Sequence, residues 1–182
     1  MKLLQRITLA LALAAASLAA QAQLKPNVGP YLVAAVGRTQ YDHDCWFFAD
    51  CQTARATFGK VGGGYRFGVF GVEGWAQDYG RSDVRPEPDK LRLRALAANA
   101  VWYASFGPQV EGLLRAGVAD VRQERSRDRT KSTFSGLFGL GLVIHLAPAV
   151  GLEFAWDITS GEGTDSGSTT ANALSVGLRL KF

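Results

Sequence analysis

The chain has 182 residues and a formal net charge of +4, and charged side chains make up 20% of it. This modest charge excludes the strongly basic surface of a nucleic-acid-binding protein, so we expect no nucleic-acid partner. The length suits a single domain. The 21 glycines are spread through segments of alternating polarity, which disfavours helices and indicates an all-β fold.

Residues 1–22 have the pattern of a secretory signal peptide. Lys2 and Arg6 make the start positive, an apolar stretch follows, and Ala20-Gln21-Ala22 is a cleavage site of the A-x-A type. The pattern predicts a mature domain of residues 23–182. A transmembrane anchor is the alternative, but it needs about 20 apolar residues and this stretch is shorter. Since no other stretch approaches that length, strands would have to cross any membrane.

Cys45 and Cys51 lie close together in a segment that the strand pattern leaves as a loop. After export they would meet an oxidising compartment, which predicts a disulfide between them. A metal site completed by His43 with Asp42 or Asp44 is the alternative. The C-x5-C spacing is not a zinc signature, so we expect no metal ion, and nothing in the sequence indicates a cofactor.

Eight segments alternate apolar and polar side chains, as strands with two different faces do. They span residues 29–41, 57–67, 69–79, 92–104, 109–121, 132–146, 150–158 and 171–182. The links between them are alternately long and short, beginning with a long one. Short turns at one end and long loops at the other are typical of membrane barrels with an even number of strands. We therefore predict an eight-stranded antiparallel up-and-down transmembrane β-barrel.

The two faces of these segments differ in kind, because one is apolar and the other holds glycines and charges. The polar face has few large side chains, which suits a narrow lumen and places the apolar face outside. Aromatic residues near the segment ends are then expected to form girdles at the membrane interfaces. They are Tyr31, Tyr41, Phe67, Phe70, Tyr79, Tyr103, Trp156 and Phe182. A soluble barrel of lipocalin type, with its apolar face inside, is the alternative.

The segment 92–104 departs from strict alternation. If Arg92 and Arg94 face inward, Asn99 faces lipid, and if Asn99 faces inward, the two arginines face lipid. A β-bulge inserts one residue and would reverse the facing between these positions. We therefore expect a bulge within residues 93–99.

Inward-facing charges of both signs should share the lumen. They are Lys60, Arg66, Glu73, Glu111, Arg115, Glu153, Arg179 and Lys181. A lone charge in a confined, poorly hydrated lumen would be costly, so we predict an ion-pair network that fills the barrel. Paired carboxylates can also act as acid and base, but structural pairing is the simpler interpretation.

Residues 174–182 carry an apolar side chain at every even position and end on the aromatic Phe182. This ending resembles the closing strand of outer-membrane β-barrels, whose assembly machinery is thought to read a C-terminal Phe. The stretches 135–148 and 151–157 are similar to the penultimate hairpin of the small outer-membrane β-barrel family typified by the OmpA transmembrane domain, OmpX and Ail. The stretch 110–121 resembles the fifth strand of that family.

The resemblance implies a location in the cell outer membrane. It also implies contact with outer-membrane lipid, including lipopolysaccharide, and recognition of Phe182 by the barrel-assembly machinery as an assembly signal. The function expected from it is structural or adhesion-like, in which the outer loops meet an extracellular ligand that the sequence does not identify. Trp46, Phe47 and Phe48 in the first long link indicate either such a contact surface or a position in the membrane interface.

A narrow pore and a membrane-embedded lipid-modifying enzyme are the alternative functions. A pore is disfavoured, because the lumen of eight strands is just wide enough for its own side chains. An enzyme would need a base, and the chain has two histidines, His43 and His145. The known barrel deacylases have a serine two residues after the histidine, where this chain has Ala147, and no G-x-S-x-G motif is present. We expect no enzyme and no catalytic residues.

Overall fold

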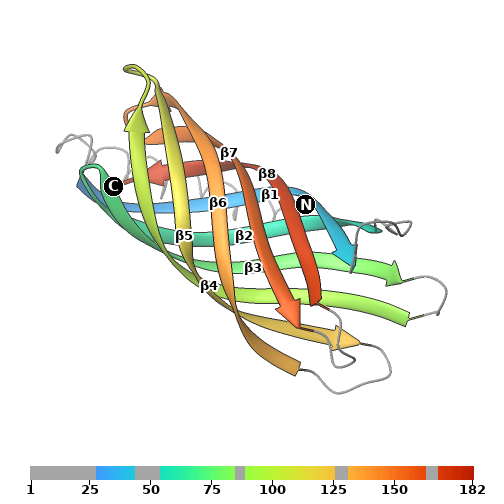
Figure 1. Ribbon diagram of the computed structural model, residues 1–182. Helices are drawn as coiled ribbons and strands as arrows, with labels where there is room; N and C mark the ends of the chain where they lie inside the picture. Colours follow the sequence, from blue (N-terminus) through green and yellow to red (C-terminus); the bar gives the residue numbers. More distant parts are fainter. Residues whose placement is uncertain (1–27, 44–53, 85–88, 126–130, 163–167) are drawn as a thin grey trace, which may run out of the picture.

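The computed structural model describes residues 28–43, 54–84, 89–125, 131–162 and 168–182, which form a closed barrel of antiparallel strands (Figure 1). The strands are β1 (Val28–His43), β2 (Ala54–Phe67), β3 (Phe70–Val84), β4 (Asp89–Ser105), β5 (Val110–Arg125), β6 (Lys131–Ala147), β7 (Val150–Glu162) and β8 (Ser168–Lys181). Each strand pairs with its neighbour in sequence, and β8 pairs with β1 to close the sheet. The predicted eight-stranded antiparallel barrel is therefore confirmed.

The short turns and Phe182 lie at one end of the barrel, and the strand ends that border the undescribed segments lie at the other (Figure 1). We call these the turn end and the loop end. In the β2–β3 turn, Phe67 pairs with Phe70, and Gly68 has a φ of +84°, which residues with a side chain rarely adopt. The strands extend past the predicted segments at the loop end, because backbone pairing does not require an apolar face.

Along the middle of the strands the outward side chains are apolar, and the buried charged side chains of β2, β3, β5, β7 and β8 point into the lumen. On β7, Phe154 and Trp156 are exposed, whereas Glu153 and Asp157 are fully buried. The same division holds on β8, where Leu174 is exposed and its neighbours are buried. This confirms the predicted facing, which is the reverse of what a soluble barrel would present to water.

Four of the eight aromatic residues expected in the outer girdles face the lumen instead, and that part of the prediction is wrong. Phe67, Phe70 and Trp156 are exposed as expected, and Phe182 is half-exposed. The four buried residues are Tyr31, Tyr41, Tyr79 and Tyr103. A buried tyrosine hydroxyl needs a hydrogen-bond partner, and each of these hydroxyl groups donates to a lumen oxygen atom.

The bulge expected within residues 93–99 is also wrong. The β4–β5 register runs without a shift from Leu91 to Ser105, with Asn99 buried and Arg94 exposed. The irregularity lies instead on β3, between Asp78 and Arg81. The outward arginines of β4 need no inward turn, because carboxylates on the neighbouring strands pair with them at the surface.

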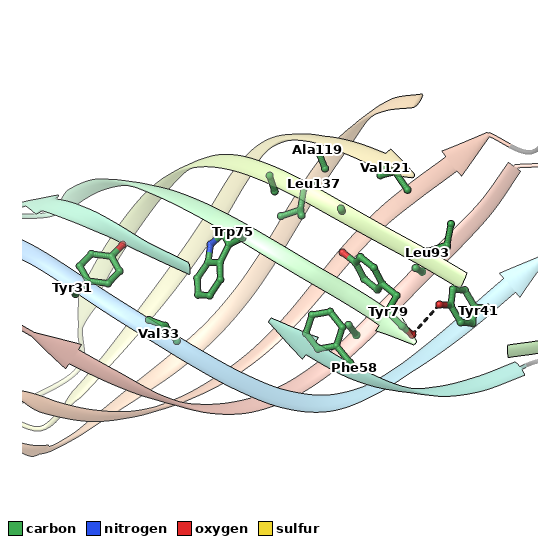
Figure 2. Close-up of a cluster of buried hydrophobic side chains, with 14 residues drawn as sticks. Tyr31, Val33, Tyr41, Phe58, Trp75, Tyr79, Leu93, Ala119, Val121 and Leu137 are labelled. Carbon is green, nitrogen blue, oxygen red and sulfur yellow. Dashed lines mark hydrogen bonds between the residues drawn. The ribbon is translucent and has the colours of Figure 1, made fainter. Parts of the chain in front are cut away.

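The lumen is filled in two layers. An apolar layer occupies the loop half and includes the fully buried Tyr41, Phe58, Tyr79 and Leu93 (Figure 2). The rings of Phe58 and Tyr79 lie 5.1 Å apart between centroids. Buried charged side chains occupy the turn half. The barrel interior is thus a packed core whose charged side chains gather in the turn half, beside a smaller apolar cluster of Val101, Tyr103, Leu113 and Val143.

Several predicted features lie outside the described residues. These are the signal peptide of residues 1–22, the disulfide between Cys45 and Cys51, and the aromatic cluster of residues 46–48. Among the described residues, no helix is long and apolar enough to cross a membrane.

The outward facing predicts that a charge placed in the middle of β6 will destabilise the barrel. Leu142→Arg should lower the free energy of unfolding by about 2–4 kcal/mol, because it places a guanidinium in lipid. Ser132→Arg on the same strand, at the loop end and beside Asp120, should cost about 1 kcal/mol or less. Urea unfolding in lipid vesicles measures both, and equal effects would contradict the assigned membrane position.

Candidate functional site: a charge network in the lumen

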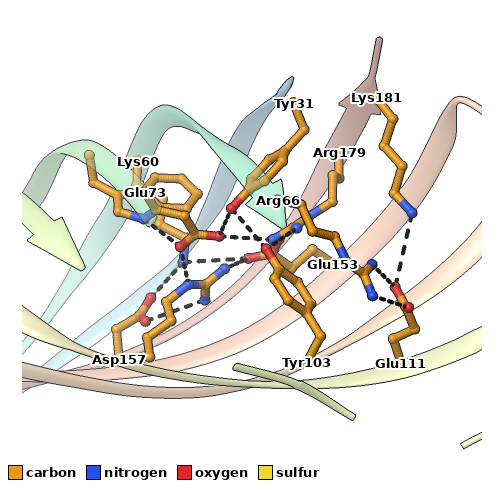
Figure 3. A network of polar contacts seen from close by, with 12 residues as sticks. Tyr31, Lys60, Arg66, Glu73, Tyr103, Glu111, Glu153, Asp157, Arg179 and Lys181 are labelled. Atoms are coloured by element: carbon orange, nitrogen blue, oxygen red, sulfur yellow. Dashed lines mark hydrogen bonds and ion pairs between the residues drawn. The ribbon is translucent and has the colours of Figure 1, made fainter. Parts of the chain in front are cut away.

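Two glutamates and two arginines form a closed ring of ion pairs in the lumen, which we call the central ring (Figure 3). Glu73 accepts from Arg115 Nε at 2.6 Å and from Arg179 Nη2 at 3.1 Å. Glu153 accepts from Arg115 Nη2 at 2.5 Å and from Arg179 Nη2 at 2.7 Å. Each carboxylate therefore bridges both guanidinium groups, and four different strands are tied together across the barrel.

Lys60 and Asp157 extend the central ring toward the apolar layer. The Lys60 ammonium donates to Asp157 Oδ2 at 2.6 Å and lies 3.9 Å from Glu153 Oε1. It also lies 4.6 Å from the centroid of the Trp75 ring, a cation–π contact. Three cationic side chains thus face three carboxylates, and the buried network is electrically neutral. Neutrality is what allows so many charges to be buried together.

Two tyrosines and a tryptophan supply further hydrogen bonds to the central ring. Tyr31 donates to Glu73 Oε1 at 2.7 Å, and Trp75 donates to Glu73 Oε2 at 2.9 Å. Tyr103 donates to the Tyr31 hydroxyl oxygen at 2.8 Å and accepts from Arg179 Nη1 at 3.0 Å. The Arg179 guanidinium also stacks over the Tyr31 ring at 4.2 Å. The carboxylate of Glu73 is therefore surrounded by four donor side chains.

A second cluster lies at the turn end of the lumen. Arg66 forms a bidentate pair with Glu111, with both N···O distances 2.8 Å. His145 Nε2 lies 2.7 Å from the same carboxylate, and Lys181 Nζ lies 4.0 Å from it. This turn-end cluster borders a cavity of about 560 Å³ that is also lined by Gln109. It is less buried than the central ring and forms the mouth of the barrel.

Glycines on the inward face leave room for the network. A Cβ atom added at Gly139 would lie 2.4 Å from Asp157 Oδ1, and one at Gly64 would lie 2.6 Å from the Tyr31 hydroxyl oxygen. Both distances are shorter than a side chain allows. The glycine-rich inward face in the sequence is therefore the space that the large lumen side chains of neighbouring strands occupy.

The structure places all eight predicted lumen charges on the inward face, and each contacts an opposite charge. They form two clusters and not one. Asp157 was not among the predicted network residues, although its spacing from Glu153 puts both on one face of β7. Tyr31 and Tyr103 were predicted in the outer girdles because they are aromatic and lie near segment ends.

The described side chains of the site form ion pairs, and none of them form an arrangement of nucleophile and general base. Within those residues, no group of three His, Cys, Asp or Glu side chains could hold a metal ion. The His145 ring contacts Glu111 and Lys181, and the nearby Ser105 hydroxyl donates to Glu111 at 3.5 Å. The side chain of His43 and the two cysteines lie outside the described part of the structure.

Comparison with known proteins supports one family. The family model of the outer membrane protein beta-barrel domain matches residues 8–182. The structure is similar to Neisserial surface protein A, with a TM-score of 0.70 and 17% identity over 85% of this chain and 97% of that one. No curated protein sequence is significantly similar to this chain.

Two Pseudomonas aeruginosa structures are also similar. Outer membrane protein OprG has a TM-score of 0.56 and 12% identity over 86% of this chain and 97% of that one. The N-terminal beta-barrel domain of OprF has a TM-score of 0.50 and 16% identity over 85% of this chain and 99% of that one. At these identities the likeness is one of fold. Together with the family match, it confirms the resemblance to small outer-membrane barrels.

The central ring predicts that removal of one carboxylate will leave buried arginines without enough partners. Glu153→Ala should cost about 3–5 kcal/mol of unfolding free energy, because two guanidinium groups and Lys60 lose a buried counter-charge. Glu124→Ala, at an exposed pair on the outer surface, should cost less than about 1 kcal/mol. Denaturant unfolding in vesicles measures both. A mild effect of Glu153→Ala would mean that the network does not stabilise the barrel.

Proposed function

Because the chain belongs to the outer membrane protein beta-barrel domain family and lies in the cell outer membrane, we propose that it is a closed barrel with a structural or surface-interaction role, such as adhesion. The observation that carries the proposal is the filled lumen. Its largest side chains, including Arg115, Arg179 and Tyr41, are less than 2% exposed. A barrel filled in this way suits a rigid support for surface loops.

A narrow pore is the competing function, and the two lumen layers argue against it. Ions would have to pass the central ring, where Arg115 and Arg179 are each held by two carboxylates. They would then have to pass the apolar layer, where Phe58 and Tyr79 pack against each other. Opening either layer would expose unpaired buried charges or apolar surface, and both are costly.

A lipid-modifying enzyme is the other competing function. The proposal that this chain is not an enzyme is supported by the surroundings of His145, which is held by a carboxylate and an ammonium group at the turn end. The lumen carboxylates are each engaged by arginine or lysine. A carboxylate paired in this way is a poor general base, since the partner cation stabilises its ionised form.

We propose three sets of partners. The exposed apolar side chains on the outside of the strands would contact outer-membrane lipid, including lipopolysaccharide. The loops would meet an extracellular ligand. The assembly machinery would recognise the closing strand and Phe182, whose backbone N–H donates to the Pro30 carbonyl oxygen at 3.1 Å and so joins the last residue to β1.

The filled lumen predicts that the refolded mature protein will not conduct ions in planar lipid bilayers. The double variant Phe58→Ala with Tyr79→Ala, which thins the apolar layer, should raise the background leak while the barrel stays folded. Single-channel recording measures both proteins. Stable unitary currents through the unmodified protein would overturn the closed-barrel function and favour a pore.

We also propose that residues 1–22 are removed on export and that Cys45 and Cys51 form a disulfide in the first outer loop. A short cross-linked loop adds at most about 3 kcal/mol, which is small beside a closed barrel. Cys45→Ser should therefore leave heat-modifiable gel migration unchanged. Thiol titration of envelope protein should find no free thiol in the unmodified chain, and two free thiols would contradict the disulfide.

A further inference from the structure

The outward face of β7, β8, β1 and β2 changes from apolar to polar across three successive rows of paired residues. The boundary row is Trp156, Leu174, Arg38 and Thr57, in strand order. The polar row, one step toward the loop end, is Ile158, Asn172, Gln40 and Arg55. The apolar row, one step toward the turn end, is Phe154, Val176, Val36 and Gly59.

Two hollows on this outer surface meet at the boundary row. The apolar hollow, of about 600 Å³, lies over β6, β7, β8 and β1 and is lined by side chains such as Leu140 and Phe154. The polar hollow, of about 440 Å³, lies toward the loop end and is lined by Gln40 and Arg55 among others. Arg38, Trp156 and Leu174 line both hollows. They therefore form one groove that begins among apolar side chains and ends beside two guanidinium groups.

Arg38 and Arg55 are exposed at the polar end of this groove. Among the described side chains, no carboxylate lies within ion-pair distance of either guanidinium. The two residues are diagonal neighbours on adjacent strands, with their Cα atoms about 7–8 Å apart. Their long side chains can both reach one anionic ligand that has more than one negatively charged oxygen.

The opposite side of the barrel differs in its charge balance. There Asp78 pairs with Arg92 and lies 3.7 Å from Arg94, which also lies 3.4 Å from Glu124. Asp120 lies 3.7 Å from Arg122. The arginines of β4 thus have carboxylate partners, whereas Arg38 and Arg55 have none among the described side chains.

We infer that the groove binds the phosphorylated glycolipid part of lipopolysaccharide in the outer leaflet. Its phosphates would lie against Arg38 and Arg55, its sugars against the Trp156 ring and the Gln40 amide, and one acyl chain along the apolar hollow. The inference rests on the proposed membrane orientation, in which the loop end faces outward. Trp156 is at the depth that interfacial aromatic residues prefer, which places the two guanidinium groups at headgroup level.

Native mass spectrometry of the full mature protein in detergent micelles tests this binding. The probes are bis-phosphorylated lipid A, the same lipid after removal of both phosphates, and phosphatidylglycerol. The unmodified protein should bind the bis-phosphorylated lipid about 10- to 30-fold more tightly than the dephosphorylated one, as expected for two arginines near an anionic headgroup. Arg38→Gln with Arg55→Gln should abolish this difference.

The matched control is Arg92→Gln with Arg94→Gln, which removes the same charge from the opposite side and should leave lipid A binding unchanged. Val36→Phe, which narrows the apolar hollow without adding charge, should weaken both forms of lipid A equally. Three results would each overturn the inference. They are an equal loss of lipid A affinity in the Arg92→Gln with Arg94→Gln control, the same affinity for lipid A with and without its phosphates, or binding of phosphatidylglycerol as tight as that of bis-phosphorylated lipid A. All three variants should keep heat-modifiable migration, and ion conductance is measured separately, so failure of this site is distinguishable from failure of the closed-barrel function.

Discussion

The pairing of Glu73 and Glu153 with Arg115 and Arg179 is the constraint on which the rest of the barrel depends. These side chains are buried from four strands, and removing any one would leave a charge without its counter-charge in a confined space. The inward glycines nearby leave the volume that the Asp157, Tyr31 and Trp75 side chains occupy. The inward face of each strand is therefore determined by its partners across the lumen as much as by its neighbours in the sheet.

The charged layer and the apolar layer of the lumen each block the passage of water and ions along the barrel axis. The charged layer is neutral and fully hydrogen-bonded at Glu73, while the apolar layer of Tyr41, Phe58, Tyr79 and Leu93 keeps water from reaching it from the loop end. Both layers favour rigidity over passage. A rigid barrel of this kind suits the proposed surface-interaction role.

The outward arginines differ in their ion pairing from one side of the barrel to the other. On β4 and β5, the outward arginines Arg92, Arg94 and Arg122 lie within ion-pair distance of carboxylates. On β1 and β2, Arg38 and Arg55 lie beside an apolar groove and have none among the described side chains. This difference between the two sides is what supports the proposed lipid site on β7, β8, β1 and β2.

The sequence by itself determined the number of strands, their antiparallel order and the facing of most residues, because a strand alternates its two faces with a strict period of two. The same rule placed all eight charged residues in the lumen. Only the tertiary structure decided which charges meet, since Lys60 and Asp157 are 97 residues apart and barrel closure brings them together. It also decided that Tyr31 and Tyr103 face inward and that the arginines of β4 stay outside without a bulge. Aromatic and charged side chains tolerate either face locally, and the partners that fix their choice come from distant strands.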